Sequence, residues 1–391
     1  MSTYPKEILQ TYTTVFGTTT KPVIVRSPGR INIIGEHTDY NEGFVLPGAI
    51  DKAAYLIVAL RDDDEIHLVA QDLNEEYRTY VNDIAPTINT SWPNYILGAV
   101  AQFKKLGIAL KGFNAVLQSD VPIGAGLSSS AAVECATVFA LNHLYNTQLD
   151  RIAMVKMAQR AEHEYAGVMC GIMDQFASMM GKQDHLIKLD CKTLEYTYVP
   201  FKLEGMKLLL LNTNVKHSLA SSAYNDRRNE CSTAVAMVAK HQPNVSSLRD
   251  VSEAMLDAYV KPYDTLIDMR SRFVVQEIQR LVDACNHLNH NDIAALGSKM
   301  FATHYGLSNM YAVSCKELDW LVDHVKDNTN VIGARMMGGG FGGCTINIIK
   351  EEAIVPLLEA LQPAYESAMQ LPLTSYVVSI DQGTSLIETY V

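Results

Sequence analysis

The chain has 391 residues, 48% of them hydrophobic, so it can bury a large core, and its length predicts two domains or one large one. Lys and Arg number 32 against 43 Asp and Glu, and the basic residues form no run, which argues against a nucleic-acid partner. The seven cysteines contain no C-x-x-C pair, the N-terminus lacks a signal pattern, and no apolar run could cross a bilayer. We therefore expect a non-exported, cytoplasmic protein without a membrane partner.

The first half of the chain alternates strands and helices. An alternating apolar run begins at Val23, and two further strands flank an acidic turn at residues 62–65, which we interpret as a solvated hairpin tip. The predicted elements that follow are a helix from residue 92, a strand at 112–124, helices at 129–146, 151–167 and 171–181, and strands at 185–191 and 196–201.

The second half is richer in helices. A buried strand is predicted at 206–215, and we place a domain boundary just before it, which gives domains 1–205 and 206–391. The remaining predicted elements are helices at 221–240, 272–288 and 291–306, a strand segment at 331–349, a helix at 351–369 and a strand at 375–380.

The stretch "VPIGAGLSSSAA", residues 121–132, joins a predicted strand to a predicted helix. It lacks the lysine of the P-loop pattern, and Ser129 stands where the dinucleotide pattern G-x-G-x-x-G has its third glycine. Glycines still let backbone amides approach an anion, and a helix N-terminus adds unpaired N–H groups and a positive dipole end. Phosphate binding is therefore one interpretation, and plain serine caps of the helix are the other.

The segment "SPGRINIIGEHTDYNEG", residues 27–43, packs an arginine, carboxylates and a histidine around a glycine. One interpretation is a polar turn in which Arg30 pairs with Glu36 or Asp39. Glu36, His37 and Asp39 could instead donate to and accept from several hydroxyl groups at once, which a polyhydroxylated sugar requires.

Two carboxylates follow the serine stretch. Glu162 lies late in one predicted helix and Asp174 in the first turn of the next, which fits metal-binding and base roles, but also a surface residue and an anion at a helix N-terminus. The stretch "GARMMGGGFGGC", residues 333–344, is explained by a flexible hairpin when it is taken alone.

Taken together, these segments resemble the GHMP small-molecule kinases in order and approximate spacing. The resemblance rests on "GRINIIGEHTDY", "PIGAGLSSSAA", "CGIMDQ" and "GGGFGG", and the first of these resembles the signature of the galactose-phosphorylating branch. It implies an α+β fold of two domains: an N-terminal α/β domain (ribosomal protein S5 domain 2-like) that binds sugar and ATP, and a C-terminal ferredoxin-like α+β domain. The active site would lie in the cleft between them.

Carried over by position, the resemblance implies a role for each matching residue. Asp174 would be the catalytic base for the anomeric hydroxyl and Arg30 its partner, with Ser130 and Glu162 at Mg²⁺. The sugar-binding residues would be Glu36, His37, Thr38, Asp39, Gly171 and Tyr224. The ATP-binding residues would be Gly124, Ala125, Gly126, Leu127, Ser128, Ser129 and Ser130, with Trp92 and Tyr95 near the base, a pair that packing of an amphipathic helix would also explain.

The implied activity is phosphorylation of the anomeric hydroxyl of α-D-galactose by ATP, giving galactose 1-phosphate, the first step of galactose metabolism. An N-acetylgalactosamine kinase remains open, because neighbouring sugar pockets differ by few contacts. A catalytically silent galactose sensor also remains open, although Arg30, Asp174, Ser130 and Glu162 are all present. We expect a monomer, or at most a weak homo-oligomer.

Overall fold

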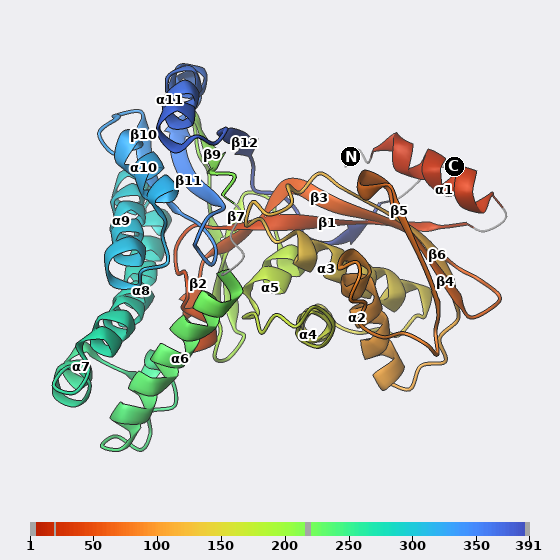
Figure 1. Ribbon diagram of the computed structural model, residues 1–391, viewed down its shortest axis with the longest axis horizontal. Coiled ribbons are helices and arrows are strands. Elements are labelled where there is room, and N and C mark those ends of the chain that lie inside the picture. The colour runs from red at the N-terminus through yellow and green to blue at the C-terminus, as the bar shows by residue number, and fades with distance from the viewer. Residues whose placement is uncertain (1–4, 19–20, 216–219, 388–391) are drawn as a thin grey trace.

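The N-terminal part of the chain is built on a six-stranded sheet (Figure 1). The structure is a computed structural model, and it describes residues 5–18, 21–215 and 220–387. The strands, in sheet order, are β13 (Ser385–Leu386), β1 (Val23–Asn32), β3 (Pro47–Leu60), β6 (Phe113–Ser119), β4 (Glu65–Ala70) and β5 (Glu75–Tyr80). All neighbours are antiparallel except β4 and β6, which run parallel. Nearly every residue of β1 is buried, because elements pack on both faces of the sheet.

The acidic turn at residues 62–65 is not a hairpin tip, so this prediction was wrong. Strands β3 and β4 do not pair, because β6 lies between them. Gly112, just before β6, allows the close approach, since a Cβ there would lie 2.1 Å from the carbonyl oxygen of Glu65. Hydrophobic alternation tells which face of a sheet a residue takes, but it does not tell which strand lies beside it.

Helices cover both faces of this sheet (Figure 1). Those on one face are α2 (Trp92–Lys105), α3 (Ser129–Leu144), α4 (Arg151–Ala161) and α5 (Met173–Met180). Helix α3 packs against β1, β3 and the other three helices, which explains its strongly apolar sequence. The other face carries α1 (Lys6–Phe16), which the sequence analysis did not predict; it buries Ile8 and Tyr12, one turn apart, against the sheet. Two buried side chains are too weak a periodic signal to identify a helix.

The second sheet carries the C-terminal part. Its strands, in sheet order, are β10 (Val331–Met336), β11 (Cys344–Lys350), β9 (Met206–Asn212) and β12 (Thr374–Val378). All pairs are antiparallel, which together with the chain order is the ferredoxin-like arrangement and confirms the α+β fold class. The helices of this part are α6 (Ala220–Ala239), α7 (Glu253–Tyr259), α8 (Thr265–Asn289), α9 (Ile293–Tyr305), α10 (Lys316–Val325) and α11 (Ile354–Met369).

A small third sheet and several short helical turns join the two parts. The sheet consists of β2 (Phe44–Val45), β7 (His185–Asp190) and β8 (Tyr196–Pro200). The short turns are η1 (Asp39–Asn41), η2 (Gln71–Leu73), η3 (Glu162–Ala166), η4 (Leu248–Asp250), η5 (Gly306–Met310) and η6 (Glu351–Ala353). Two of them matter for the site, because η1 and η3 carry predicted site residues.

The end of the described chain returns to the N-terminal sheet. Strand β13 pairs with β1, and Arg26 donates to Asp381 at 2.7 Å. The hydroxyl oxygens of Ser27 and Thr384 lie 2.8 Å apart, and Thr384 also donates to the carbonyl oxygen of Ser178 at 2.9 Å. The chain therefore crosses between the two parts twice, while the boundary at residue 205 stays a prediction.

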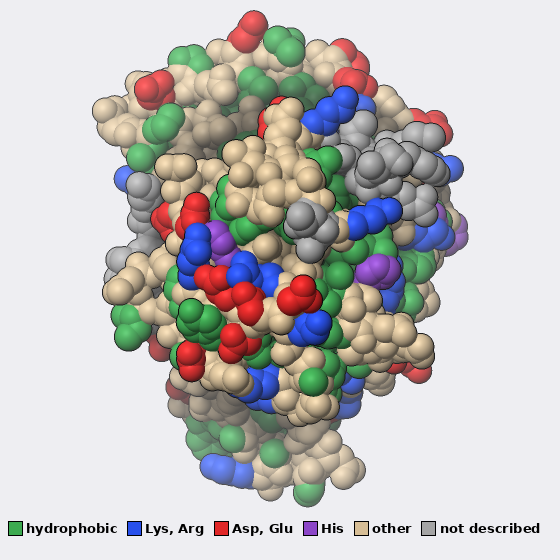
Figure 2. Space-filling model, turned by 90° about the vertical axis from the view of Figure 1, so that its right-hand side faces the viewer, with side chains coloured by type: hydrophobic (Ala, Val, Ile, Leu, Met, Phe, Trp, Pro, Cys, Tyr) green, Lys and Arg blue, Asp and Glu red, His purple; other side chains and the backbone are tan. Residues whose placement is uncertain are grey.

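The surface at the N-terminal end mixes charges of both signs. Figure 2 shows acidic and basic side chains intermingled on this face. At the acidic turn, nitrogens of Arg61 lie 2.6 Å from Asp63 and 2.7 Å from Glu65. Such pairing fits a solvated acidic turn. None of the helices that the structure describes combines the length and apolar character needed to span a bilayer.

We predict that Thr384→Val lowers the free energy of unfolding by about 1–3 kcal/mol, because valine keeps the shape but removes the buried hydrogen bonds that the Thr384 hydroxyl makes with Ser27 and Ser178. Thr384 is fully buried. Urea unfolding measures the loss. The matched control is Thr233→Val on the exposed face of α6, which should change stability by less than about 0.5 kcal/mol. Equal effects at the two positions would contradict this view of the C-terminal tether.

Candidate active site

A pocket of about 230 Å³ opens between the two parts of the chain. Its walls come from β1, η1, the segment between η3 and α5, helix α6 and the glycine-rich turn between β10 and β11. The lining residues are Arg30, Glu36, His37, Asp39, Glu162, Gly167, Val168, Met169, Cys170, Gly171, Met173, Asp174, Tyr224, Asn225, Gly338 and Gly339. Segments that are far apart in sequence therefore meet here, and three of the four motifs contribute to the lining, whereas residues 121–132 do not.

Arg30 and Asp174 form a two-point ion pair in this pocket. Nε and Nη2 of Arg30 donate to the two carboxylate oxygens of Asp174 at 2.8 and 2.9 Å, a planar geometry that a lysine could not reproduce. Nη1 of Arg30 donates to the carbonyl oxygen of Gly126 at 2.6 Å. The side chain of Arg30 is 6% exposed and that of Asp174 is 26% exposed, so the pair is sheltered while the carboxylate stays open to the pocket.

The phosphate loop, residues 124–130, has a backbone shaped by left-handed conformations. Gly124 and Gly126 have φ of 74°, and Ser128 has φ of 59°, which is easy for glycine and costly for serine. Ser128 stands at the N-cap of α3, yet its hydroxyl does not cap the helix. It donates instead to Oδ2 of Asp174 at 2.5 Å. The plain-cap interpretation therefore fails for Ser128, and the loop is tied to the carboxylate.

The glycine-rich turn between β10 and β11 lies against the phosphate loop. A Cβ at Gly338 would lie 3.9 Å from the carbonyl oxygen of Gly126, and one at Gly343 would lie 3.6 Å from that of Ala125. Gly340 has φ of 87°, and a Cβ there would lie 2.1 Å from the carbonyl oxygen of Val313, so only glycine fits. The two loops therefore pack against each other.

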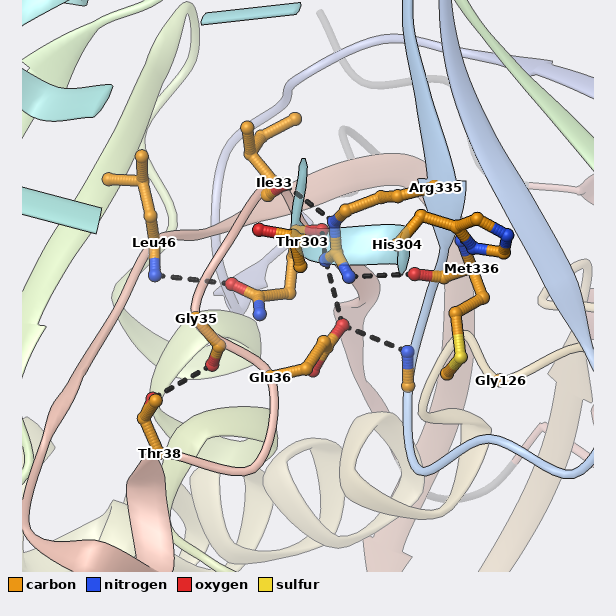
Figure 3. Close-up of polar contacts among 12 residues, drawn as sticks. Ile33, Gly35, Glu36, Thr38, Leu46, Gly126, Thr303, His304, Arg335 and Met336 are labelled. Carbon is orange, nitrogen blue, oxygen red and sulfur yellow. Dashed lines mark hydrogen bonds and ion pairs between the residues drawn. The ribbon is translucent and has the colours of Figure 1, made fainter. Parts of the chain in front are cut away.

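Glu36 is fixed by a charge from the other part of the chain (Figure 3). Nη2 of Arg335 donates to Oε1 of Glu36 at 2.8 Å, and the backbone N–H of Gly338 donates to the same oxygen at 2.9 Å. Burial raises the pKa of Glu36, but the charges of Arg335 and Arg30 outweigh it, and the net pKa is lowered. Glu36 is therefore ionised, and both contacts leave its second oxygen to the pocket.

Arg335 holds the surrounding backbone as well. It is fully buried, and its three nitrogens also donate to carbonyl oxygens, Nη2 doing so in addition to its bond with Glu36. The acceptors are Ile33 at 2.7 Å, Asn32 at 2.5 Å and Met336 at 2.7 Å. A buried guanidinium needs this full set of acceptors. The result is that β10 is held against the end of β1, within residues 27–43, which we call the sugar segment after its predicted role.

His37 faces the pocket among tyrosine rings. Its Nδ1 lies 2.8 Å from the hydroxyl of Tyr40, which lies 2.8 Å from the hydroxyl of Tyr311. The ring of Tyr224 is centred 5.5 Å from that of His37. Burial lowers the pKa of His37 to about 4, so the ring is neutral near pH 7. Its buried Nε2 has no hydrogen-bond partner among the described residues, which leaves it for a ligand.

Asp39 and Gly171 sit against each other. A Cβ at Gly171 would lie 1.6 Å from Oδ2 of Asp39, so the loop can pass over the carboxylate only with glycine at this position. Burial raises the pKa of Asp39 to about 6, and the charges of Asp174 and Glu36 act in the same direction. The ionised form of Asp39 is therefore costly without a ligand that donates hydrogen bonds.

Ser130 and Glu162 are brought within one hydrogen bond of each other. The hydroxyl of Ser130 donates to Oε1 of Glu162 at 3.1 Å, and Glu162 opens η3, a π-helical turn of a kind often found at functional sites. Burial and the charge of Asp174 raise the pKa of Glu162, so a cation would relieve an unfavourable charge there. The described residues contain no cluster of three or more His, Cys, Asp or Glu suited to a metal. A hydroxyl and one carboxylate nevertheless fit Mg²⁺, which keeps waters and phosphate oxygens as its other ligands.

The pocket is not lined by residues 124–130, by Thr38 or by Trp92, although all of them are predicted site residues. The buried hydroxyl of Thr38 donates to the carbonyl oxygens of Gly35 at 2.9 Å and Phe44 at 2.5 Å, so it shapes the sugar segment from behind. Trp92 is 8% exposed and donates from Nε1 to Glu75 at 2.7 Å. The packing explanation accounts for the Trp92 side chain, and its contact with a nucleotide stays a prediction.

Sequence reasoning missed the residues that support the site from outside. Arg335 stands in the stretch at residues 333–344 that was interpreted as a flexible hairpin, and Gln175, which donates to Glu162 at 2.6 Å, stands beside the singled-out Asp174. The only signal for each was a polar residue within a motif that also contains apolar residues. Such a signal names no partner, because the partners lie in other elements.

Known protein families match the chain in three stretches. Residues 10–60 match the galactokinase galactose-binding signature, residues 94–182 match the N-terminal domain of GHMP kinases, and residues 281–367 match the GHMP kinase C-terminal domain. The first stretch contains the sugar segment, and the second contains both the phosphate loop and Asp174.

Whole-chain relatives agree with these matches. The chain is 40% identical to a galactokinase of Thermotoga neapolitana, with 93% of this chain and 99% of the relative covered, and 39% identical to one of Halalkalibacterium halodurans, with 92% and 91% covered. The crystal structure of Lactococcus lactis galactokinase complexed with galactose superposes with a TM-score of 0.92 at 32% identity, covering 97% of this chain and 99% of that one. A mevalonate kinase structure at 22% identity and a TM-score of 0.64 shares the fold alone. The chain therefore belongs to the galactokinases of the GHMP kinase family.

Proposed function

We propose that this protein transfers the γ-phosphoryl group of ATP to the anomeric hydroxyl of α-D-galactose, giving galactose 1-phosphate and ADP. The observation that carries the proposal is the Arg30–Asp174 ion pair, which lies between the sugar segment and the phosphate loop. A carboxylate that faces the pocket and accepts a hydrogen bond from the phosphate loop supports a role for Asp174 where the sugar hydroxyl and the phosphate would meet.

Asp174 acts as the base for the sugar hydroxyl. As the anomeric oxygen bonds to the γ-phosphorus, the bond from that phosphorus to ADP breaks and the hydroxyl proton passes to the carboxylate. An ordinary aspartate is a far weaker base than an alkoxide, so the proton moves late, when the new P–O bond has formed. The two nitrogens of Arg30 and the hydroxyl of Ser128 hold the carboxylate in one orientation.

Arg30 takes the place of the missing lysine of the phosphate loop. Its Nη1 already reaches the carbonyl oxygen of Gly126 within that loop, so its charge lies beside the space where phosphate oxygens would sit. The transition state of phosphoryl transfer carries charge on these oxygens, and a fixed cation there lowers the barrier. We expect backbone amides of residues 124–130 and the N-terminus of α3 to hold the remaining phosphate groups.

Mg²⁺ would be held by Ser130 and Glu162 together with phosphate oxygens, and when bound it supplies positive charge against the transferred phosphoryl group. The protein's own contribution at this point is the placement of Glu162. Its Oε1 faces the hydroxyl of Ser130 in the first turn of α3, so both groups lie where the phosphate loop ends.

Sugar recognition relies on groups of fixed character. Glu36 is an ionised acceptor, the neutral ring of His37 offers Nε2, and Asp39 is an acceptor with a raised pKa. Tyr224 closes the pocket from α6. A hexose presents several hydroxyl groups that each donate and accept, and a set of this kind discriminates strongly, because a mismatched sugar leaves a buried group unpaired.

The direct test is ADP release measured with galactose, N-acetylgalactosamine, glucose and mevalonate. We expect galactose to give a kcat/KM at least about 100-fold above the others, since each unpaired buried group costs on the order of 1–3 kcal/mol. Preference for the N-acetylated sugar would favour that alternative substrate. Galactose binding without ADP release would mean a silent sensor.

For Asp174→Asn, we expect kcat to fall by a factor of about 10² or more, because the amide cannot accept the proton. Binding of ATP, followed by calorimetry, should change little. Asp62→Asn is the matched control, since Asp62 is fully exposed in the acidic turn. A turnover number for Asp174→Asn near that of the control would reject the base assignment.

For Asp39→Asn, we expect weaker galactose binding together with a more stable ligand-free protein at pH 8. The folded-state pKa of about 6 lies above the ordinary 3.8, so ionised Asp39 destabilises the folded state above pH 6, and the penalty disappears below about pH 4. Thermal unfolding at pH 8 and pH 4 should therefore show a gain in Tm at the higher pH only. The same gain at both pH values would show that the charge is not its cause.

A further inference from the structure

Two polar side chains lie in the core between α3 and α5 and take no part in the mechanism above. Glu134 and Gln175 are both fully buried, amid apolar residues such as Cys135 and Phe176. Burying a carboxyl group and an amide is costly unless each finds a partner. Their presence at this position therefore requires an explanation from their contacts.

The amide of Gln175 joins two carboxyl groups. Its Nε2 donates to Oε2 of Glu162 at 2.6 Å and to Oε2 of Glu134 at 3.0 Å. A glutamine amide has two hydrogens, so both are used, and the nitrogen is held between α3, α5 and the start of η3. The reverse orientation of the amide would set its oxygen against two carboxyl oxygens.

The two oxygens of the Glu162 carboxylate have different hydrogen-bond partners. Oε2 receives the amide of Gln175 and the thiol of Cys170, the latter at 3.2 Å. Oε1 is left facing the hydroxyl of Ser130. The carboxylate is thereby held through Oε2, while Oε1 points to the hydroxyl of Ser130, with which it would share Mg²⁺.

Glu134 is placed to keep the amide in this orientation. It lies one helical turn after Ser130 on α3, so both residues lie on one face of that helix. Burial and the charge of Glu162 raise the pKa of Glu134 well above its usual range. A neutral Glu134 lets the amide serve two carboxyl groups without placing two negative charges at one point.

We propose that Gln175 is a positioning residue that fixes the carboxylate of Glu162 for the metal, and that Glu134 is the anchor that holds the Gln175 amide. This inference rests on the proposed role of Glu162 as a ligand of Mg²⁺. Groups that orient metal ligands from behind commonly change metal affinity about 10- to 100-fold when they are removed.

The test is binding of Mn²⁺, used as a probe for Mg²⁺, to the protein with ADP, followed by electron paramagnetic resonance. Gln175→Met keeps the length of the side chain and removes the amide, and we expect the Kd of Mn²⁺ to rise about 10-fold or more. Gln102→Met is the matched control, because Gln102 is also buried and donates to a glutamate, Glu164, at 2.8 Å. Its Kd for Mn²⁺ should stay unchanged.

Glu134→Leu provides an independent variant, since it removes the anchor and leaves every atom beside the metal in place. We expect a smaller rise in the Kd of Mn²⁺, and we expect the double variant with Gln175→Met to bind no worse than Gln175→Met alone, because the two residues act in series. Additive losses would contradict the anchor role. Galactose binding without nucleotide should be unaffected in every folded variant.

Glu162→Gln separates this inference from the proposed function. If Glu162→Gln weakens Mn²⁺ binding and Gln175→Met does not, the positioning role is rejected and the metal role of Glu162 stands. If Glu162→Gln leaves Mn²⁺ binding unchanged, the metal role is rejected and the positioning role falls with it. Turnover of galactose by the unmodified protein is unaffected by either result and tests the proposed function alone.

Discussion

The rest of the site depends on the hydrogen bonds of the Arg30 guanidinium. Two of its nitrogens fix both oxygens of Asp174, and the third holds the carbonyl oxygen of Gly126 in the phosphate loop. One buried planar cation thus sets the distance between the proposed base and the place of the phosphates. Ser128 closes the arrangement from the loop side, at the cost of a left-handed backbone. Lysine, a single point charge, could not make these contacts together.

A second buried arginine fixes the sugar side of the pocket. Arg335 comes from the C-terminal sheet, yet its acceptors lie largely on the N-terminal segment that carries Glu36. Gly338, at the start of the glycine-rich turn, donates to the same carboxylate oxygen. Glu36 and the glycine-rich turn are therefore held by one set of hydrogen bonds. That turn packs against the phosphate loop. Each side of the pocket is therefore held by a buried arginine, Arg30 or Arg335, whose guanidinium makes several hydrogen bonds.

Both burial and ion pairing shift the pKa values of the acidic groups in the pocket. Arg335 and Arg30 lower the pKa of Glu36, whereas Asp39, which has no such partner, has its pKa raised to about 6. The unpaired buried Nε2 of His37 and the raised pKa of Glu162 belong to the same pattern. Burying each of these groups costs free energy, and a hydroxyl donor or a cation from a ligand would offset that cost. These groups therefore lower the stability of the folded protein while they serve ligand recognition.

The α+β class followed from the family resemblance. By itself the sequence determined most of the helices and strands and the four motifs, because local periodicity and short-range patterns carry that information. It also placed Arg30 and Asp174 in one site, although only through a family resemblance. Tertiary structure decided which strands are neighbours, as the insertion of β6 between β3 and β4 shows, and which charges meet, as with Arg335 and Glu36. It also turned Thr38 away from the pocket and revealed Gln175 behind Glu162. These contacts join residues far apart in the chain, and no local pattern encodes the partner of a buried polar group, because the partner is set by packing of whole elements.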